Sequence, residues 1–190
     1  MKKCVFSCVE GLRSRFSRLL AAFCVAAGMS PVLAEDSSIQ TVYLSANSSY
    51  GEGKGVAGAV WTYADGTLVG EDGKIALESQ PNYDFVISNK RYVDPRTGET
   101  IKAHKIIIGD GGSYGTLRCR LQPIYECTEG IVLANGMIRT TTTNHRTIQG
   151  KITVTAPSSS PFLFDTTGSS AGGITFSGVF CGAEGTGFRF

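Results

Sequence analysis

Short runs of alternating apolar and polar residues, separated by turn residues, recur from about residue 39 to residue 190. The runs are rich in Val, Ile, Thr, Tyr and Phe, which favour strands, and the alternation at 151–155 is typical of a strand with one exposed face. Asp-Gly and Asn-Gly pairs, which tolerate the positive φ of tight turns, stand between runs at 65–66, 72–73, 110–111 and 135–136. The pattern predicts strands at 39–45, 56–63, 67–70, 74–78, 84–93, 100–108, 116–121, 124–128, 130–134, 137–142, 147–155, 162–164, 174–180 and 187–190.

Helical periodicity is missing after residue 34, because no stretch there has apolar residues at helical spacing over three turns without Gly or Pro. The number of predicted strands is too large for one flat sheet, and two packed sheets or a barrel would bury one face of each strand. We therefore expect an all-β fold, an antiparallel β-sandwich of immunoglobulin-like or pilin-like form. The Ser- and Gly-rich stretch 157–173 is expected to be a long loop held by Phe162-Leu163-Phe164. No internal repeat of fixed period is visible.

Residues 1–34 have the pattern of an export signal. Five basic residues precede an apolar core at 19–29 that is too short to span a bilayer, and Val32-Leu33-Ala34 supplies small residues for a cleavage site. Cys24 follows the bulky Phe23, which argues against lipid attachment. The sequence predicts a signal peptide at 1–34, one β-rich domain at 35–190, and an extracytoplasmic location reached through the periplasm.

Composition narrows the classes of function. The signal takes five of the 18 basic residues and one of the 16 acidic ones, so residues 35–190 are slightly acidic and a nucleic-acid binder is not expected. No run of apolar residues after the signal is long enough for a membrane helix. We expect no cofactor and no metal, because neither a C-x-x-C nor an H-x-x-x-H spacing accompanies the cysteines and the two histidines.

Three cysteines follow the signal, and an oxidising compartment favours disulfides among them. Cys119 and Cys127 flank Pro123 at a predicted hairpin tip, so we expect a bridge between them, with Cys181 free or bonded to a partner. Bridges from Cys181 to either of the other two remain alternatives, because sequence spacing does not fix connectivity.

Two motifs suggest chemistry and have simpler interpretations. Residues 111–115 match G-x-S-x-G around Ser113, but a strand with a proline follows instead of a helix, which favours a glycine-rich turn after the strand at 105–108. Residues 53–58 match G-x-G-x-x-G, but they also lead into a strand. Trp61 lies in an apolar run and is expected in the core. We therefore predict a protein that is not an enzyme.

A basic, aromatic-bearing surface is predicted where residues 84–108 would form a hairpin around the turn at 94–98. Such a surface suits an anionic glycan, lipopolysaccharide or an acidic protein partner, although basic residues also protect edge strands from aggregation. The candidate ligand-binding residues are Lys90, Arg91, Tyr92, Arg96, Lys102 and Lys105.

The combination of a basic signal, one β domain rich in Gly, Ser and Thr, an N-terminal apolar strand and an aromatic terminal strand resembles bacterial fimbrial subunits and adhesins. The resemblance implies that the N-terminal strand completes a neighbouring subunit's sheet and that the last strand meets a periplasmic chaperone. The residues it assigns to assembly are Ile39, Val42, Leu44, Phe188 and Phe190. The expected function is thus a cell-surface structural or adhesive one, through assembly with other subunits and binding of a host glycan or protein receptor. The alternative is a free periplasmic or secreted binding module.

Overall fold

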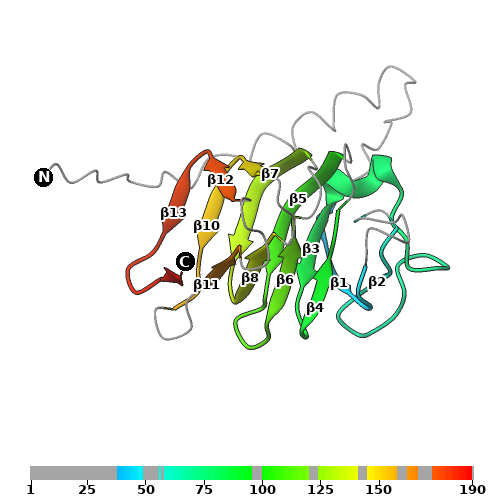
Figure 1. The fold of residues 1–190 in the computed structure, drawn as a ribbon. Coiled ribbons are helices and arrows are strands. Elements are labelled where there is room, and N and C mark those ends of the chain that lie inside the picture. Colours follow the sequence, from blue (N-terminus) through cyan, green and yellow to red (C-terminus); the bar gives the residue numbers. More distant parts are fainter. Residues whose placement is uncertain are drawn as a thin grey trace, which may run out of the picture. The chain divides into compact units, whose positions relative to one another are not determined.

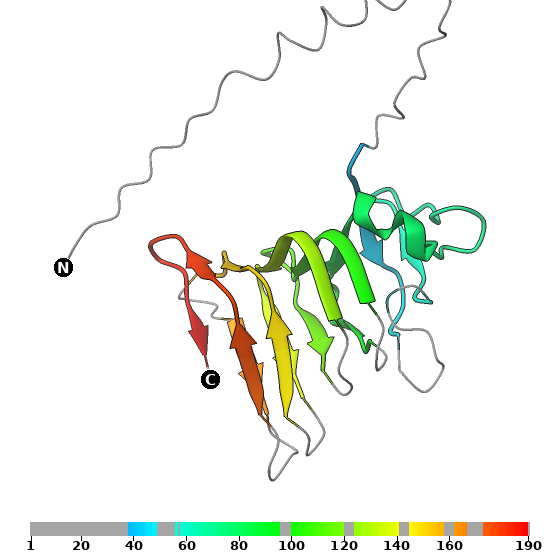
Figure 2. The same cartoon turned by 90° about the horizontal axis from the view of Figure 1, so that it is seen from above.

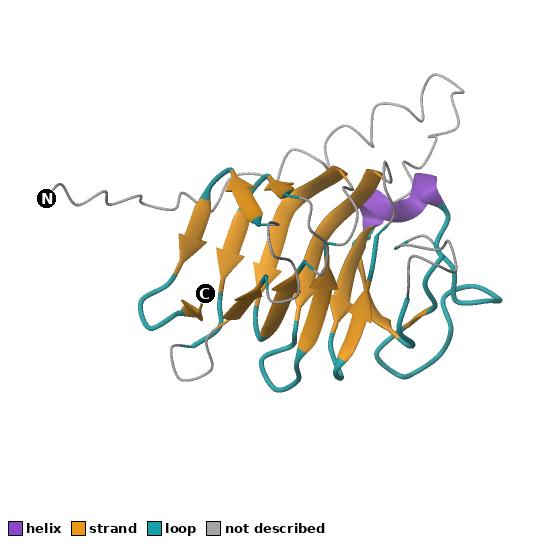
Figure 3. Ribbon diagram, in the orientation of Figure 1, coloured by secondary structure: helices purple, strands orange, loops and turns teal. Residues whose placement is uncertain are grey.

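The computed structural model describes residues 38–48, 56, 58–95, 100–119, 124–140, 145–157, 162–166 and 173–189. The chain divides into two compact units, residues 1–37 and 38–190, and all described residues belong to the second. Their regular elements are strands, apart from one 3-10 helix, η3 (Leu77–Asn82) (Figure 3). The predicted all-β character is therefore confirmed.

The strands form three sheets, in which nearly every neighbouring pair is parallel. The seven-stranded sheet has the order β13 (Phe180–Gly182), β10 (Ile152–Val154), β7 (Ile124–Leu133), β5 (Thr100–Ile108), β3 (Tyr83–Ile87), β1 (Gln40–Leu44), β2 (Trp61–Thr62). The five-stranded sheet has the order β14 (Phe188–Arg189), β11 (Phe162–Asp165), β8 (Gly136–Arg139), β6 (Gly115–Arg118), β4 (Arg91–Val93). The two-stranded sheet pairs β12 (Ile174–Ser177) with β9 (Arg146–Gln149).

The order of these strands makes the domain a parallel β-solenoid. The chain passes from β3 to β4, then returns to place β5 beside β3 and β6 beside β4, and continues in the same way through β7 and β8. The parallel strands of the seven-stranded sheet consequently stand side by side from β1 to β13, with β2 beyond β1 (Figures 1 and 2). The predicted antiparallel β-sandwich is wrong. The segments between strands carry the chain around a coil to a parallel neighbour, and do not form hairpins between antiparallel strands.

Apolar side chains stack from coil to coil inside the solenoid. In the seven-stranded sheet the register aligns one residue from each parallel strand, and we call this set the inner column: Val42, Phe85, Ile106, Ile131, Ile152 and Phe180. The five-stranded sheet contributes Val93, Leu117, Ile138 and Phe164 to the same core. Stacking of β-branched and aromatic residues in register is what holds such coils together.

The N-terminal end of the solenoid is closed by the segment between β1 and β3. Within it, β2 pairs antiparallel with β1, and Trp61 is fully buried against Phe85, with ring centroids 4.6 Å apart. The Trp61 indole nitrogen donates to the Val56 carbonyl oxygen at 3.0 Å. The expectation that Trp61 belongs to the core is confirmed.

Several predicted elements change in detail. The predicted strand at 84–93 divides into β3 and β4, because Asn89 and Lys90 take positive φ angles of 55° and 60° and turn the chain between sheets. The predicted strand at 74–78 is replaced in part by η3. The stretch 157–173 is not one long loop, since it contains β11, and its residues 158–161 and 167–172 lie outside the described part. The predicted hairpin at 84–108 does not form, because β3 and β5 are parallel.

Candidate functional site

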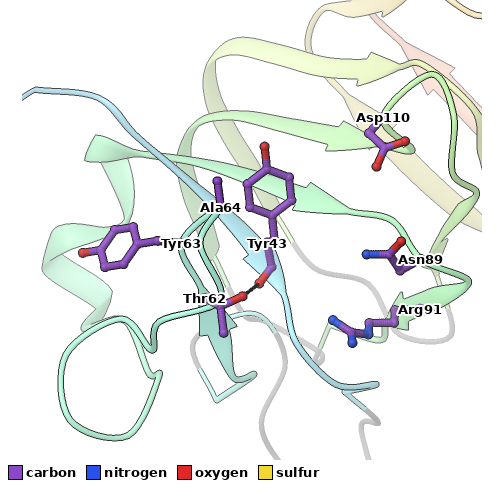
Figure 4. Close-up of a pocket in the computed structure, with 8 residues that line it drawn as sticks. Tyr43, Thr62, Tyr63, Ala64, Asn89, Arg91 and Asp110 are labelled. Carbon is purple, nitrogen blue, oxygen red and sulfur yellow. Dashed lines mark hydrogen bonds between the residues drawn. The ribbon is translucent and has the colours of Figure 1, made fainter.

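An open cleft lies outside the solenoid near its N-terminal end, with a volume of about 360 Å³ (Figure 4). Three separate parts of the chain meet there: β1, the tight turn after β2, and the corners that connect the seven-stranded to the five-stranded sheet. The lining residues are Tyr43, Thr62, Tyr63, Ala64, Gly66, Asn89, Arg91 and Asp110.

Tyr43 occupies the middle of the cleft (Figure 4). Its neighbours Val42 and Leu44 are buried in the core, so the alternation of β1 directs Tyr43 to the outer face. The strand is held at this point by the Thr62 hydroxyl, which donates to the Tyr43 carbonyl oxygen at 3.4 Å. The Tyr43 hydroxyl has no hydrogen-bond partner among the described residues, which leaves it available to a ligand.

One wall of the cleft is the turn that follows β2. The Asp65 carboxylate accepts hydrogen bonds from the backbone and hydroxyl of Thr67, at 2.9 and 2.7 Å, while Gly66 takes a φ of 87°. These hydrogen bonds lower the pKa of Asp65. Tyr63 is fixed in turn, since its hydroxyl donates to the Gln40 side chain at 3.0 Å. The Tyr63 ring packs against the core and points away from Tyr43, so its side chain fixes this wall and does not stack beside Tyr43 (Figure 4).

Polar side chains from two sheet corners form the opposite side (Figure 4). Asp110 organises its own corner by accepting the backbone N–H groups of Gly112 and Ser113 at 3.1 and 2.6 Å through one carboxylate oxygen. Asn89 is tied to the same corner, because the Ser113 hydroxyl donates to its amide oxygen at 3.1 Å. These bonds hold the two polar side chains in place before any ligand arrives.

Arg91 is the one lining residue of the cleft that the sequence also predicts as a ligand-binding candidate. It begins β4, is half-buried, and donates from one terminal nitrogen to the Leu44 carbonyl oxygen. That bond anchors the guanidinium against β1 and uses one of its five N–H donors. The remaining donors can meet a carboxylate in the bidentate geometry that arginine favours.

The other predicted ligand-binding residues do not gather with Arg91. Lys90 is exposed at the same corner, but the Tyr92 ring lies on the five-stranded sheet with the Arg118 guanidinium 3.3 Å from its centroid. Lys105 pairs with Asp84 at 3.2 Å and Lys102 is exposed on the first half of β5, whereas Arg96 lies outside the described residues. They scatter because β4 and β5 belong to different sheets and do not form a hairpin.

In the described part of the chain, Ser113 and the two histidines each bond to a different side chain and do not lie together. Ser113 bonds to Asn89 in a turn between β5 and β6, as the glycine-rich interpretation predicted. His104 bonds to Asp84 at 2.6 Å, and His145 bonds to Thr175. Among the described residues, no group of three His, Cys, Asp or Glu side chains is arranged around a common metal position.

The strands assigned to assembly are occupied within the domain itself. Val42 and Leu44 are buried in β1 between β2 and β3, so this strand completes its own sheet, and Ile39 is exposed just before it. Phe188 belongs to β14, which pairs with β11, and Phe190 lies outside the described residues. Among the described residues, both strands that the fimbrial resemblance assigns to assembly pair within their own domain.

The predicted Cys119–Cys127 disulfide is absent from the structure, in which Cys119, Cys127 and Cys181 are thiols. Cys119 faces the core at the end of β6, 3.9 Å from the Tyr125 hydroxyl, whereas Cys127 belongs to the long strand β7 and not to a hairpin tip. Burial raises the pKa of the Cys119 thiol to about 12, and burial likewise raises the pKa of Cys127 to about 12.

These pKa values predict slow alkylation of Cys119 and Cys127 in the folded protein. The thiolate is the reactive form, so at pH 8 we expect their reaction with iodoacetamide to be at least about 100-fold slower than in guanidinium chloride. Peptide mass spectrometry of a labelling time course without reductant measures this. Cys119 and Cys127 that stay unlabelled in denaturant until reductant is added would contradict the thiol state and restore the disulfide.

Comparison of the chain with protein-family models, curated proteins and solved structures finds no match. Within the described residues, no helix has the length and apolar character needed to cross a membrane. The function proposed below consequently rests on the cleft and on the export pattern of residues 1–34.

Proposed function

We propose that this chain is an exported bacterial cell-surface protein with an adhesive role, and that the corner cleft binds an acidic saccharide without catalysis. Export is supported by the basic front, short apolar core and small residues of 1–34. Adhesion is supported by one observation above all, which is the meeting of Tyr43 with Asn89, Arg91 and Asp110 in one open cleft.

The chemistry of the cleft suits a sugar. Saccharides combine weakly polar C–H faces, which stack on aromatic rings, with hydroxyl groups that need donors and acceptors held in fixed positions. Tyr43 supplies the ring, and Asn89 and Asp110 supply oriented polar groups. Arg91 favours a sugar that carries a carboxylate, because a guanidinium binds a carboxylate through two parallel hydrogen bonds.

Replacing Tyr43 by alanine is expected to weaken binding of an oligouronate by about fivefold, since one aromatic contact contributes on the order of 1 kcal/mol. Isothermal titration of residues 35–190 with an oligouronate and a neutral oligosaccharide of equal length measures this. Tyr92→Ala is the matched control, because Tyr92 lies away from the cleft beside Arg118. Arg91→Lys should reduce the preference for the acidic sugar over the neutral one.

Two results would contradict the proposal. Equal loss of binding in Tyr92→Ala and Tyr43→Ala would move the site to the five-stranded sheet. Absence of binding to both oligosaccharides would remove the saccharide from the proposal. Circular dichroism of each variant checks that a loss of binding is not caused by unfolding.

A free secreted or periplasmic binding module is the second candidate and would use the same cleft. The two differ in where the protein resides, with an adhesive protein remaining on the cell and a free module appearing in the periplasm or medium. Immunoblotting of surface-shear, periplasmic and medium fractions from the native host separates them.

A further inference from the structure

The corner cleft holds one positive and one negative side chain that do not pair with each other. Among the described residues that line it, the charged ones are Arg91 and Asp110. Figure 4 shows them on one side of the cleft with Asn89 between them. The contacts give the same order, because Ser113 bonds to both Asp110 and Asn89, and Arg91 lies two residues beyond Asn89. Within the described part of the chain neither Arg91 nor Asp110 forms an ion pair, so both charges are available to a ligand.

Asp110 uses only one of its two carboxylate oxygens in the fold. Its Oδ1 accepts the N–H groups of Gly112 and Ser113, whereas its Oδ2 has no partner among the described residues. The residue is exposed, and the two bonds to Oδ1 fix the direction of the carboxylate. Oδ2 is therefore a held, negatively charged acceptor at one end of the cleft.

Two further charged residues stand beside the cleft without being among its lining residues. Asp65 lies in the turn after β2, where its carboxylate accepts hydrogen bonds from Thr67. Lys90 is exposed next to Asn89 at the corner between β3 and β4. These two charges are of opposite sign, so the electrostatic character of the cleft depends mainly on Arg91 and Asp110.

A ligand that carries only carboxylates meets opposed effects in this cleft. Arg91 attracts a carboxylate, but Asp110 repels it, and a site discriminates through such repulsive groups as well as through attractive ones. A ligand ammonium group reverses the second effect. It has three N–H donors, and the acceptors at that end of the cleft are Asp110 Oδ2 and the Asn89 amide oxygen.

We propose that the cleft selects a saccharide that carries an amino group as well as a carboxylate, with the ammonium at Asp110 and the carboxylate at Arg91. This inference rests on the saccharide function proposed above and narrows its ligand. Tyr43, in the middle of the cleft, supplies the ring on which the sugar stacks (Figure 4). A sugar whose amino group is acetylated keeps its carboxylate but leaves Asp110 without a cation.

The test compares an aminouronate oligomer with the same oligomer after N-acetylation, which removes the positive charges and keeps the carboxylates. Isothermal titration at pH 7 and low ionic strength uses residues 35–190, which contain the whole compact unit 38–190. We expect the wild type to bind the aminouronate oligomer about fivefold more tightly than the N-acetylated one, the upper range for an exposed ion pair.

Asp110→Asn separates the role of the charge from the role of the turn. Asparagine keeps an oxygen that can accept the N–H groups of Gly112 and Ser113, but it has no negative charge. The variant should lose the preference and should bind the N-acetylated oligomer about twofold more tightly than the wild type does, because the repulsion is gone. Asp72→Asn is the matched control: it changes the net charge equally in another Asp-Gly turn, outside the lining residues, and should keep the preference.

The outcomes distinguish this inference from the function on which it rests. Equal affinity of the wild type for both oligomers, or an unchanged preference in Asp110→Asn, would overturn the amino-group selection. The saccharide cleft would still stand in that case if Tyr43→Ala weakened both oligomers. Failure of the wild type to bind these oligomers and the oligouronate would remove the saccharide function, and the amino-group selection with it.

Discussion

Replacement of Gly115 by alanine is expected to lower the free energy of unfolding by about 3 kcal/mol or more, a large part of the roughly 5–15 kcal/mol that stabilises a typical domain. An added Cβ would lie 1.7 Å from the Ile87 carbonyl oxygen and 3.1 Å from the Gly109 nitrogen. That oxygen accepts the Gly109 N–H at 2.8 Å, so the new methyl group would enter a hydrogen bond between successive coils. Both neighbours are backbone atoms, and relief requires β3 and β5 to move.

Gly112→Ala is the control for this prediction. Gly112 lies in the same corner, but a Cβ there would meet only the Asp110 carboxylate at 3.8 Å, an ordinary contact. We expect its effect to stay within about 0.5 kcal/mol, as for most exposed positions. Urea unfolding followed by circular dichroism measures both variants. Equal midpoints would show that the corner accommodates a methyl group and that coil spacing there is not tight.

The positions of the strands could be predicted from the sequence with good accuracy. The predicted strand at 100–108 coincides with β5, and the one at 39–45 contains β1, because alternation and β-branched residues are local signals. The division of 84–93 was missed, since positive φ at Asn89 and Lys90 is uncommon for residues other than glycine. Local pattern therefore located the strands but not every bend between them.

The arrangement of the strands could not be predicted from the same signals. The alternation of apolar and polar residues indicates that a strand has an inner and an outer face, but the same alternation occurs in parallel and antiparallel strands. Asp110-Gly111 and Asn135-Gly136 suit a hairpin turn, and here they form corners between two sheets. The coils also differ in length, as the spacing of the inner column from Phe85 to Phe180 shows, so no fixed repeat marks the solenoid.

A signal for the coil does exist in the glycines that precede short apolar runs. Gly130 and Gly178 turn the chain before β7 continues and before β13 begins, and each packs against backbone of the neighbouring coil, Gly130 at Lys151 and Gly178 at Gly150. The sequences that follow them are apolar, Ile131-Val132-Leu133 and Val179-Phe180-Cys181. Recurrence of glycine before such runs indicates stacked corners better than it indicates hairpins.

Most residues of the cleft could not be predicted from the sequence, because their meeting depends on the arrangement of the strands. Its residues come from three segments that only the coil brings together, and of the predicted set it contains Arg91 alone. Tyr43 and Tyr63 resembled ordinary strand residues, and Asp110 resembled a turn residue, which it also is. Lysines and arginines that lie near one another in the sequence predicted a single basic surface, whereas the solenoid distributes them over separate sheets.

Loss of Trp61 is expected to produce the other large effect, a decrease of about 3–5 kcal/mol in the free energy of unfolding for Trp61→Ala. The indole is fully buried, contacts Phe85 and donates to the Val56 carbonyl oxygen, while the Trp61 backbone bonds to Gly73 and Val69. Removing the ring leaves a cavity at the closed end and exposes the start of the inner column.

Trp61→Phe separates packing from hydrogen bonding at this position. It keeps an aromatic ring against Phe85 but removes the indole donor to the Val56 carbonyl oxygen, which still accepts the Ala59 N–H at 3.3 Å, so we expect a cost of about 0.5–1.5 kcal/mol for the lost hydrogen bond. Leu68→Ala, exposed in the same segment, should change stability by no more than about 0.5 kcal/mol. Urea midpoints from circular dichroism give the order expected, with Trp61→Ala lowest, Trp61→Phe intermediate and Leu68→Ala near the wild type. If Trp61→Ala matched Leu68→Ala, the segment between β1 and β3 would not be a stabilising cap, and the closed end would hold together through the β1–β2 pairing instead.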